Sequence, residues 1–114
     1  MTLTRESLLK LKPKVEKITI KGFGDAYIRN MTELQRSKRM AQLFDKNGKP
    51  DFKEQMRSRV YSIVDQLCSE EGKPIFTEGD IKEIMALDSN QLDSICNAIE
   101  DWNISKQEKN ESGE

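Results

Sequence analysis

The sequence of 114 residues contains no histidine. Histidine is the side chain that most often serves as a general base, as a metal ligand or as a charge switch near neutral pH. The adjacent carboxylates at 70–71 and 100–101 do not replace it, because neighbouring residues of a helix do not face each other and form no acid–base couple. We therefore predict a protein that is not an enzyme and that uses neither a metal ion nor a cofactor.

Cysteines and long apolar runs are also scarce. Cys68 and Cys96 each lie in an apolar helical pattern without the spacing of metal ligands, so we expect reduced core residues rather than a disulfide. No run approaches the roughly 18 apolar residues that span a bilayer, and the start of the chain lacks the pattern of a signal peptide. These absences predict a cytoplasmic protein that does not bind membranes.

Charged residues are plentiful but unevenly distributed. Residues 1–66 carry 15 Lys and Arg against 8 Asp and Glu, a net charge of +7, whereas residues 67–114 carry 4 against 12, a net charge of −8. This asymmetry reflects either chance with an acidic tail or two ends of opposite charge that suit head-to-tail self-association. Only 35% of the residues are apolar, so the core must be modest and association would add stability.

Nucleic acid is not an expected partner. The basic residues in the middle of the chain lack the interleaved aromatic residues of nucleic-acid-binding sequences, and the isoelectric point of about 5.6 opposes sequence-independent binding to phosphates. We interpret them as solvated helix faces. These basic residues are Arg36, Lys38, Arg39, Arg57 and Arg59.

The hydrophobic pattern predicts an α+β protein that is mainly α-helical. A short helix is expected at 4–12, and alternating apolar residues around a glycine-rich turn predict a β-hairpin at 15–30. The helical part at 32–103 completes a single globular domain over residues 1–103, with the small N-terminal hairpin packed on about four to five helices. Residues 104–114 contain one apolar residue, so we expect a disordered polar tail there.

The helical part begins with Thr32 and Gln35 at the spacing of a capping box. The strongest helix is predicted from Phe52 to Ser69, and the last helix begins at Asp88 or Ser89, because each contains one continuous apolar stripe. The first stripe consists of Phe52, Met56, Val60, Ile63, Val64 and Leu67, and the second of Leu92, Ile95, Cys96, Ile99 and Trp102.

One phrase occurs twice, as GKPDFKE at Gly48–Glu54 and as GKPIFTE at Gly72–Glu78. It could mark a pair of ion-binding loops, a structural repeat or a helix start used twice. A calcium-binding EF-hand loop that began at Asp45 would need glycine at its sixth position and glutamate at its twelfth, where this chain has Pro50 and Met56. The ion-binding interpretation therefore fails.

Two interpretations remain, a structural repeat and a helix start used twice. A structural repeat requires that the two copies stay similar beyond the shared phrase. The residues after the two copies do not align, and a solenoid usually needs three or more repeats. A helix-start signal fits better, because glycine permits a tight bend and proline ends the preceding element. Asp51 with Glu54, and Thr77 with Asp80, then have the spacing to cap the following helix.

Three aromatic residues are candidates for contact with a partner protein. Phe23 lies in the GFG turn of the hairpin, where an aromatic side chain has no local core to enter unless the hairpin folds back over the helices. GFG is not a phosphate-binding loop, since neither the Lys-Ser/Thr pair nor a helix follows it. Trp102 ends the last apolar stripe and is a core residue or a half-exposed contact. Tyr27 of the hairpin is the third candidate.

The order of these features resembles the tail assembly chaperones of long-tailed bacteriophages and prophages. The resemblance covers about residues 4–103: a short leucine-bearing segment, the hairpin ITIKGFGDAYIRN, a TELQR helix start, and a last helix that ends in an asparagine after an aromatic residue. Its most distinctive part is SEEGKPIFTEGD at 69–80. The GFG turn has no counterpart that we can assign in that family.

The resemblance implies a non-enzymatic chaperone that binds the tape-measure protein and the major tail protein, self-associates in the host cytoplasm and is absent from the mature virion. Many members are made in two lengths through a ribosomal frameshift, and Glu108-Lys109-Asn110 can be encoded by the slippery codons GAA AAA AAC. The alternative is a small cytosolic adaptor that recognises a partner helix and has no role in virion assembly.

Overall fold

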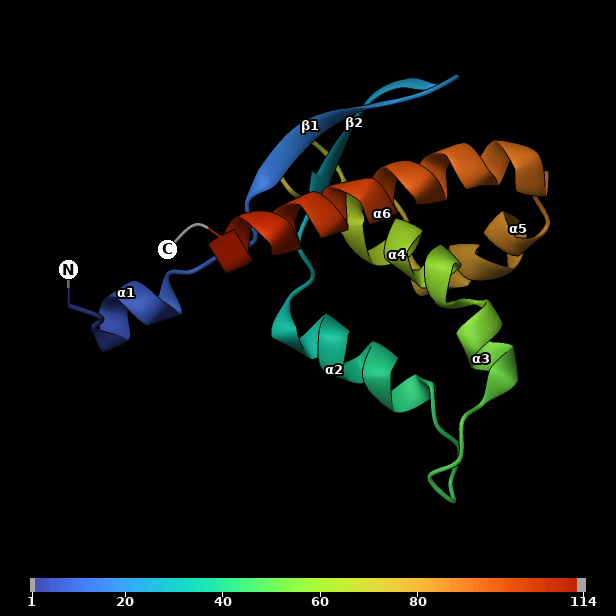
Figure 1. Cartoon of the computed structure of the whole chain (residues 1–114), viewed down its shortest axis with the longest axis horizontal. Coiled ribbons are helices and arrows are strands. Elements are labelled where there is room, and N and C mark those ends of the chain that lie inside the picture. Colours follow the sequence, from blue (N-terminus) through green and yellow to red (C-terminus); the bar gives the residue numbers. More distant parts are fainter. Residues whose placement is uncertain (1, 113–114) are drawn as a thin grey trace.

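The computed structural model describes residues 2–112, and the side chains of residues 2–107. Among these residues it contains six α-helices and a three-stranded antiparallel sheet (Figure 1), which confirms the predicted α+β class. The elements in chain order are α1 (Arg5–Leu9), β1 (Val15–Ile20), β2 (Gly24–Arg29), α2 (Glu33–Gln42), α3 (Phe52–Met56), α4 (Ser58–Gln66), β3 (Leu67–Cys68), the short 3₁₀ helix η1 (Glu78–Asp80), α5 (Ile81–Met85) and α6 (Ser89–Ser112).

The sheet consists of the predicted hairpin and a third strand that the sequence did not indicate. Val15 of β1 lies opposite Arg29 of β2, and Tyr27 of β2 lies opposite Cys68 of β3. An isolated two-stranded hairpin is marginal in water, so β3 supplies the support that the hairpin needs. The helix predicted up to Ser69 therefore ends too late, because the backbone becomes extended at Leu67.

The predicted helix from Phe52 is also broken near its start. Arg57 separates α3 from α4 with φ −91° and ψ −6°, which turns α3 away from the line of α4. As a result Phe52 and Met56 are 74% and 79% exposed instead of joining the buried stripe. The rest of the predicted stripe, from Val60 to Leu67, is buried as expected.

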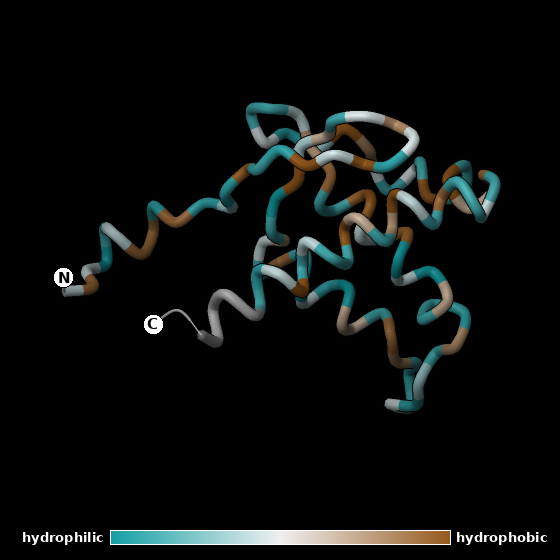
Figure 2. The backbone as a smooth tube through the Cα atoms, turned by 45° about the horizontal axis from the view of Figure 1, so that its top comes forward, coloured by the Kyte–Doolittle hydropathy of each residue, from teal (hydrophilic) through white to brown (hydrophobic). Residues whose placement is uncertain are grey.

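The core lies where α4 packs against α6, α5 and the sheet. In Figure 1, α6 crosses α4 between the hairpin and α2, and it packs against α4 and β1. Figure 2 shows that apolar residues also occur outside this interior, on the segment that leads to the N-terminus. The core residues are Ile28, Val60, Ile63, Val64, Leu67, Ile84, Leu92, Cys96, Ile99 and Trp102.

Both cysteines are buried free thiols, as predicted. Cys96 lies in α6, but Cys68 lies in β3 and not in a helix. Burial raises the pKa of each thiol above its usual value, because the thiolate would lose its hydration. Both groups therefore remain protonated and unreactive at neutral pH.

Two polar pairs join α6 to the rest of the core. The indole N–H of Trp102 donates to a Glu16 carboxylate oxygen of β1 at 2.7 Å. The Asn103 and Gln66 amides donate to each other at 3.0 and 2.8 Å, although Gln66 is only 1% exposed. Buried amides are stable only when they are paired in this way, so the Trp-Asn sequence fixes α6 on both α4 and the sheet.

The prediction of a disordered tail from residue 104 is wrong for residues 104–112, because α6 continues to Ser112. Lys106 explains part of the extension, since its ammonium group pairs with Glu16 and lies 5.6 Å from the centre of the Trp102 ring. The segment is also rich in lysine, glutamate and glutamine, which favour helix. Residues 113–114 lie outside the described residues.

The two GKP phrases form the same turn. Gly48 and Gly72 both have positive φ, 78° and 87°, the left-handed region that glycine enters without strain. In the first turn the Gly48 N–H donates to the Asp45 carbonyl at 3.0 Å, and in the second the Gly72 N–H donates to the Ser69 carbonyl at 2.9 Å. The bend predicted from glycine is therefore present in both copies.

The predicted helix starts after these turns are also present. The Asp51 carboxylate accepts from the Glu54 N–H at 3.2 Å at the start of α3, and the Asp80 carboxylate accepts from the Thr77 N–H at 2.7 Å at η1. The last helix begins after Asp88, whose carboxylate accepts from the Asn90 N–H at 2.8 Å. Local sequence thus determines where these helices begin.

Candidate protein-interaction surfaces

The side chains that the structure describes include no group of three or more cysteines, aspartates or glutamates that could hold a metal ion. No described helix is both long enough and apolar enough to cross a membrane. The features that stand out are surfaces with exposed apolar side chains. On a small domain such surfaces are typical of contact with other proteins.

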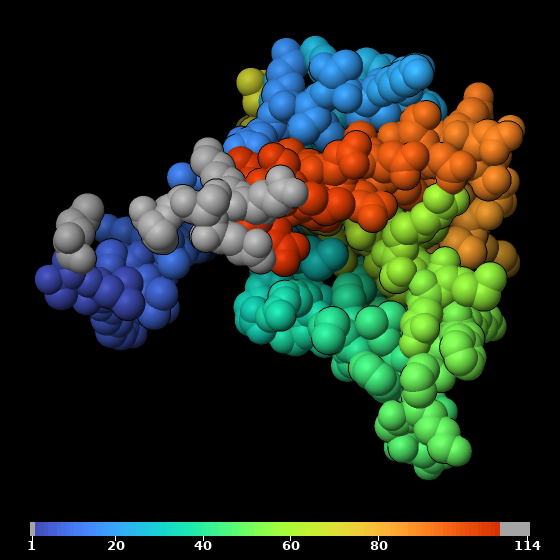
Figure 3. Space-filling model, in the orientation of Figure 1, coloured from blue at the N-terminus to red at the C-terminus, as the bar shows by residue number. Residues whose placement is uncertain are grey.

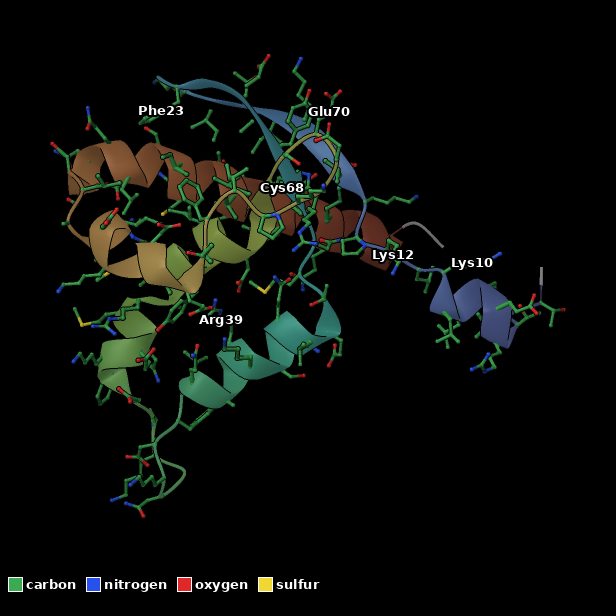
Figure 4. All side chains as sticks on the ribbon, turned by 180° about the vertical axis from the view of Figure 1, so that it is seen from behind. Lys10, Lys12, Phe23, Arg39, Cys68 and Glu70 are labelled. Carbon is green, nitrogen blue, oxygen red and sulfur yellow. The ribbon has the colours of Figure 1, made fainter. Side chains whose placement is uncertain are left out.

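The three aromatic candidates do not form one surface. Phe23 is 58% exposed at the tip of the hairpin (Figure 4). Tyr27 is half-buried on the face of β2 opposite to Ile28, because side chains alternate along a strand, and Ile28 is in the core with Trp102. Trp102 is only 9% exposed and hydrogen-bonded to Glu16, so the structure gives it a role in the core.

Sequence reasoning missed three groups of exposed apolar residues. We name them the leucine arm (residues 2–14), the α2–α3 surface (residues 33–57) and the α5 end (residues 75–88). The sequence did contain one indication of these surfaces. Their apolar residues lie in or beside short helices and turns, which bury few side chains. Their exposed apolar members are Leu3, Leu8, Leu9 and Leu11 on the arm, Leu34, Met40, Phe44, Phe52 and Met56 on the α2–α3 surface, and Ile75, Met85 and Leu87 at the α5 end.

The α2–α3 surface is joined to the core by Arg39 of α2 and by Glu54 of α3, which accepts a hydrogen bond from the Tyr61 hydroxyl. Among the described residues of α2, Arg39 alone is buried. Its guanidinium donates from Nε and Nη2 to the two oxygens of Asp65 at 2.7 and 2.9 Å, a bidentate pair, and it also contacts Glu78. The guanidinium lies 4.2 Å from the centre of the Tyr61 ring. Arg39 thus joins α2 to α4 and to η1 at the same point.

This network has clear electrostatic consequences. The hydrogen bond from Arg39 holds the pKa of Glu78 below its usual value. The hydrogen bond to Asp65 raises the pKa of Arg39 above its usual value, so the arginine stays charged at all ordinary pH. Asp65 is 4% exposed, and a carboxylate buried to this extent requires such a partner.

Because α2 contacts the core through the polar side chain of Arg39, its apolar residues Leu34 and Met40 stay exposed to solvent and can contact another protein. A cavity of about 200 Å³ opens between α2 and α4 beside Met40, which is 52% exposed. The α2–α3 surface carries seven basic and four acidic residues, a net charge of +3. Such a surface fits an apolar side chain from a partner that carries acidic residues beside it. The cavity is lined by Met31, Arg36, Arg39, Met40, Leu43, Ser58, Tyr61 and Ser62.

The leucine arm projects from the body of the protein, as the space-filling view shows (Figure 3). Its helix α1 begins with a capping box, in which the Ser7 N–H donates to the Thr4 hydroxyl at 3.1 Å and the Thr4 N–H donates to the Ser7 hydroxyl at 3.0 Å. All five residues of α1 are exposed. Its leucines are 49–72% exposed, counting Leu3 and Leu11 beside the helix.

The α5 end combines apolar and acidic residues. Ile75, Met85 and Leu87 are 54%, 45% and 55% exposed. A shallow cavity of about 450 Å³ lies beside Met85, between α5 and the first turns of α4. The segment carries four acidic residues and one lysine, a net charge of −3.

Comparison with models of protein families finds no match, and no curated protein matches the sequence. The structure, however, is similar to a solved structure, the tail assembly chaperone of bacteriophage HK97, with a TM-score of 0.56. The alignment covers 83% of this chain and 94% of the chaperone, and the two sequences are 12% identical. At this identity the likeness shows a shared fold, and it confirms at the level of fold the resemblance that the sequence motifs indicate.

Proposed function

We propose that this protein is a non-enzymatic chaperone of phage tail assembly that binds tail proteins non-covalently and self-associates. The observation that carries the proposal is the fold shared with the HK97 tail assembly chaperone over 83% of the chain. The sequence supports it independently, through SEEGKPIFTEGD and the order of hairpin and helices. The exposed apolar surfaces are those that a protein with protein partners needs.

The clients that we propose are the tape-measure protein and the major tail protein, bound in the host cytoplasm and released before the virion matures. The α2–α3 surface is the proposed client site. Its methionines and phenylalanines, its cavity of about 200 Å³ and its net positive charge fit an amphipathic helix with acidic residues beside its apolar face. Phe23 at the hairpin tip is a second proposed contact, and Tyr27 a third.

A co-purification experiment tests this function. The tagged protein is co-expressed with the tape-measure and major tail proteins encoded in the same genome, and the retained proteins are identified by mass. We expect Phe52→Ser, at a position 74% exposed, to reduce retention at least tenfold without loss of helicity. The matched control is Ile104→Ser, at a 46% exposed position of α6, which should retain both clients. Wild-type protein that retains neither tail protein would refute the proposal.

The gene sequence offers a second test, which separates the chaperone from an adaptor that only recognises a partner helix. A slippery heptamer at codons 108–110 that opens into a long −1 reading frame would support a tail assembly chaperone made in two lengths. Without it, a chaperone of one length and the adaptor explain the chain equally well. The co-purification experiment then decides between them.

A further inference from the structure

We propose that the leucine arm of one copy docks on the α5 end of a second copy, so that copies join head to tail. This inference rests on the self-association included in the proposed function and assigns it to two surfaces.

The arm itself requires a partner. A helix of five residues is too short to be stable alone in water, even with a capping box, and every leucine of the arm is about half exposed or more. These side chains lie next to Lys10 and Lys12, so the arm is both apolar and basic. Burial of the leucines against another surface would provide the stability that the helix lacks.

The α5 end has the complementary properties. Ile75, Met85 and Leu87 are exposed, and Met85 lines a shallow cavity of about 450 Å³. The arm carries four basic residues and one acidic residue, a net charge of +3, and the α5 end has the opposite charge of −3, or −2 when Glu78, which pairs with Arg39, is left out. An apolar contact flanked by opposite charges is favourable in both respects.

The arrangement of the two surfaces selects a second copy as the occupant. They lie at opposite ends of the long axis in Figure 1, and the longest extent of the molecule is 47 Å. Figure 4 shows Lys10 on the projecting arm and Lys12 where the arm joins the body, beside the cavity that Trp102 and Lys106 of α6 also line. An arm therefore meets an α5 end only on another copy, and the contact joins two different surfaces.

Charge also excludes the other large apolar surface as the docking site of the arm. The α2–α3 surface carries a net charge of +3, equal in sign to that of the arm. Like charges at a contact are unfavourable, so the α2–α3 surface stays free for a client while copies join through their ends.

Two variants test the docking. The arm variant is Leu8→Asp with Leu11→Asp, and the end variant is Met85→Lys with Leu87→Lys. All four positions are at least 45% exposed, so circular dichroism should show folded proteins. The control is Leu34→Asp, at an 80% exposed leucine of α2.

Light scattering coupled to size exclusion gives the readout. We expect wild type and the control to rise in mass with concentration and to fall with added salt. Each variant alone should be a monomer. A mixture of the two should form a complex of two copies and nothing larger, because the arm variant keeps its α5 end and the end variant keeps its arm. A mixture that stays monomeric, or an arm variant that associates like wild type, would overturn the proposal.

The outcomes also separate this inference from the proposed function. An arm variant that still self-associates but retains tail proteins would refute the docking and leave the chaperone function in place. A two-copy complex in the mixture, with no tail protein retained by wild type, would support the docking and refute the chaperone function. A wild-type protein that stays monomeric but co-sediments with anionic lipid vesicles would assign the arm to a membrane surface and refute the docking.

Discussion

The two GKP segments have nearly the same sequence and the same turn but very different surroundings. The likeness extends before the phrase, since QLFDKNGKPDFKE at 42–54 and QLCSEEGKPIFTE at 66–78 share seven of thirteen residues. In both, an antiparallel bridge closes the turn, from Phe44 to Pro50 in the first and from Cys68 to Pro74 in the second. Phe44 is 49% exposed, whereas Cys68 is 3% exposed and pairs with β2.

The difference shows that the local sequence sets the geometry of the turn but not its burial. A Cβ atom added to Gly48 would meet nothing within 4 Å, whereas one added to Gly72 would lie 3.1 Å from Cγ2 of Val15. The second segment follows α4, whose apolar face enters the core. The first follows α2, in which Arg39 is the one buried side chain among the described residues. The helix before each turn therefore determines whether the turn is buried against the core or exposed to solvent.

We expect the largest change in stability from the Arg39 network. This network joins α2, which precedes the first GKP segment, to Asp65 of α4 and to Glu78 at the end of the second segment. Arg39→Ala should lower the free energy of unfolding by about 3–5 kcal/mol, because Asp65 would remain buried without a partner. Urea denaturation followed by circular dichroism measures this. The control is the double variant Arg39→Met with Asp65→Leu, which should be close to wild type because no buried charge is left unpaired. Equal midpoints for Arg39→Ala and wild type would contradict the role of the network.

The glycines of the two turns give the next largest effect. Gly48→Ala should cost about 1 kcal/mol, the strain of a side chain in the left-handed region. Gly72→Ala should cost about 2–3 kcal/mol, because the new methyl group also crowds Val15. The same denaturation experiment compares the two variants. Equal losses of stability in Gly48→Ala and Gly72→Ala would show that the contact with Val15 adds nothing to the cost of the substitution at Gly72.

The residues before the turns sharpen the comparison further. Cys68→Ser should lose about 1–2 kcal/mol, since a hydroxyl would replace a buried thiol. Phe44→Ser, at the equivalent exposed position, should change stability by no more than about 0.5 kcal/mol. Thermal unfolding of both variants measures the difference. A larger loss for Phe44→Ser would show that the first turn contributes to the core.

The smallest effect concerns pH and Glu78. Arg39 lowers the pKa of Glu78 below its ordinary value of 4.5, so this carboxylate stabilises the fold above pH 4.5 and loses that contribution as the pH falls through its lower folded pKa. Glu78→Gln should remove this part of the acid sensitivity. Urea midpoints of wild type and variant at pH 6 and pH 3.5 test it, and the difference between the two proteins should shrink at the lower pH. A constant difference would contradict the coupling.

Much of the fold follows from local chemistry and was predictable. Thr32, Asp51 and Asp88 cap helices as their side chains dictate, and Gly48 and Gly72 adopt the bends that only glycine enters easily. What was not predictable depends on residues far apart in sequence. Leu67 and Cys68 form a strand because β2 is beside them, and a strand of two residues has no periodicity to detect.

The candidate surfaces were less predictable than the fold. Phe23 was identified from its place in a turn, but Phe52 and Met56 of α3 were interpreted as part of a buried stripe, and the apolar residues of α2 were not singled out. Met56 was expected to be buried because the helix was expected to be continuous. The sequence pattern does not show the break at Arg57, which the structure reveals. Trp102 was a candidate because it is an aromatic residue near the end of the apolar pattern, and the carboxylate of Glu16 that pairs with it lies 86 residues away.

The single buried arginine of α2 also has a consequence for amide hydrogen exchange. A segment that buries almost no apolar surface can open without exposing the core, so we expect its amide protons to exchange through a local opening whose main cost is the broken Arg39–Asp65 pair and whose free energy lies below that of global unfolding. The amides of α4, whose side chains form the centre of the core, exchange only when the whole protein unfolds. We therefore expect two populations of amide protons, with α2 and the turn after it in the faster one.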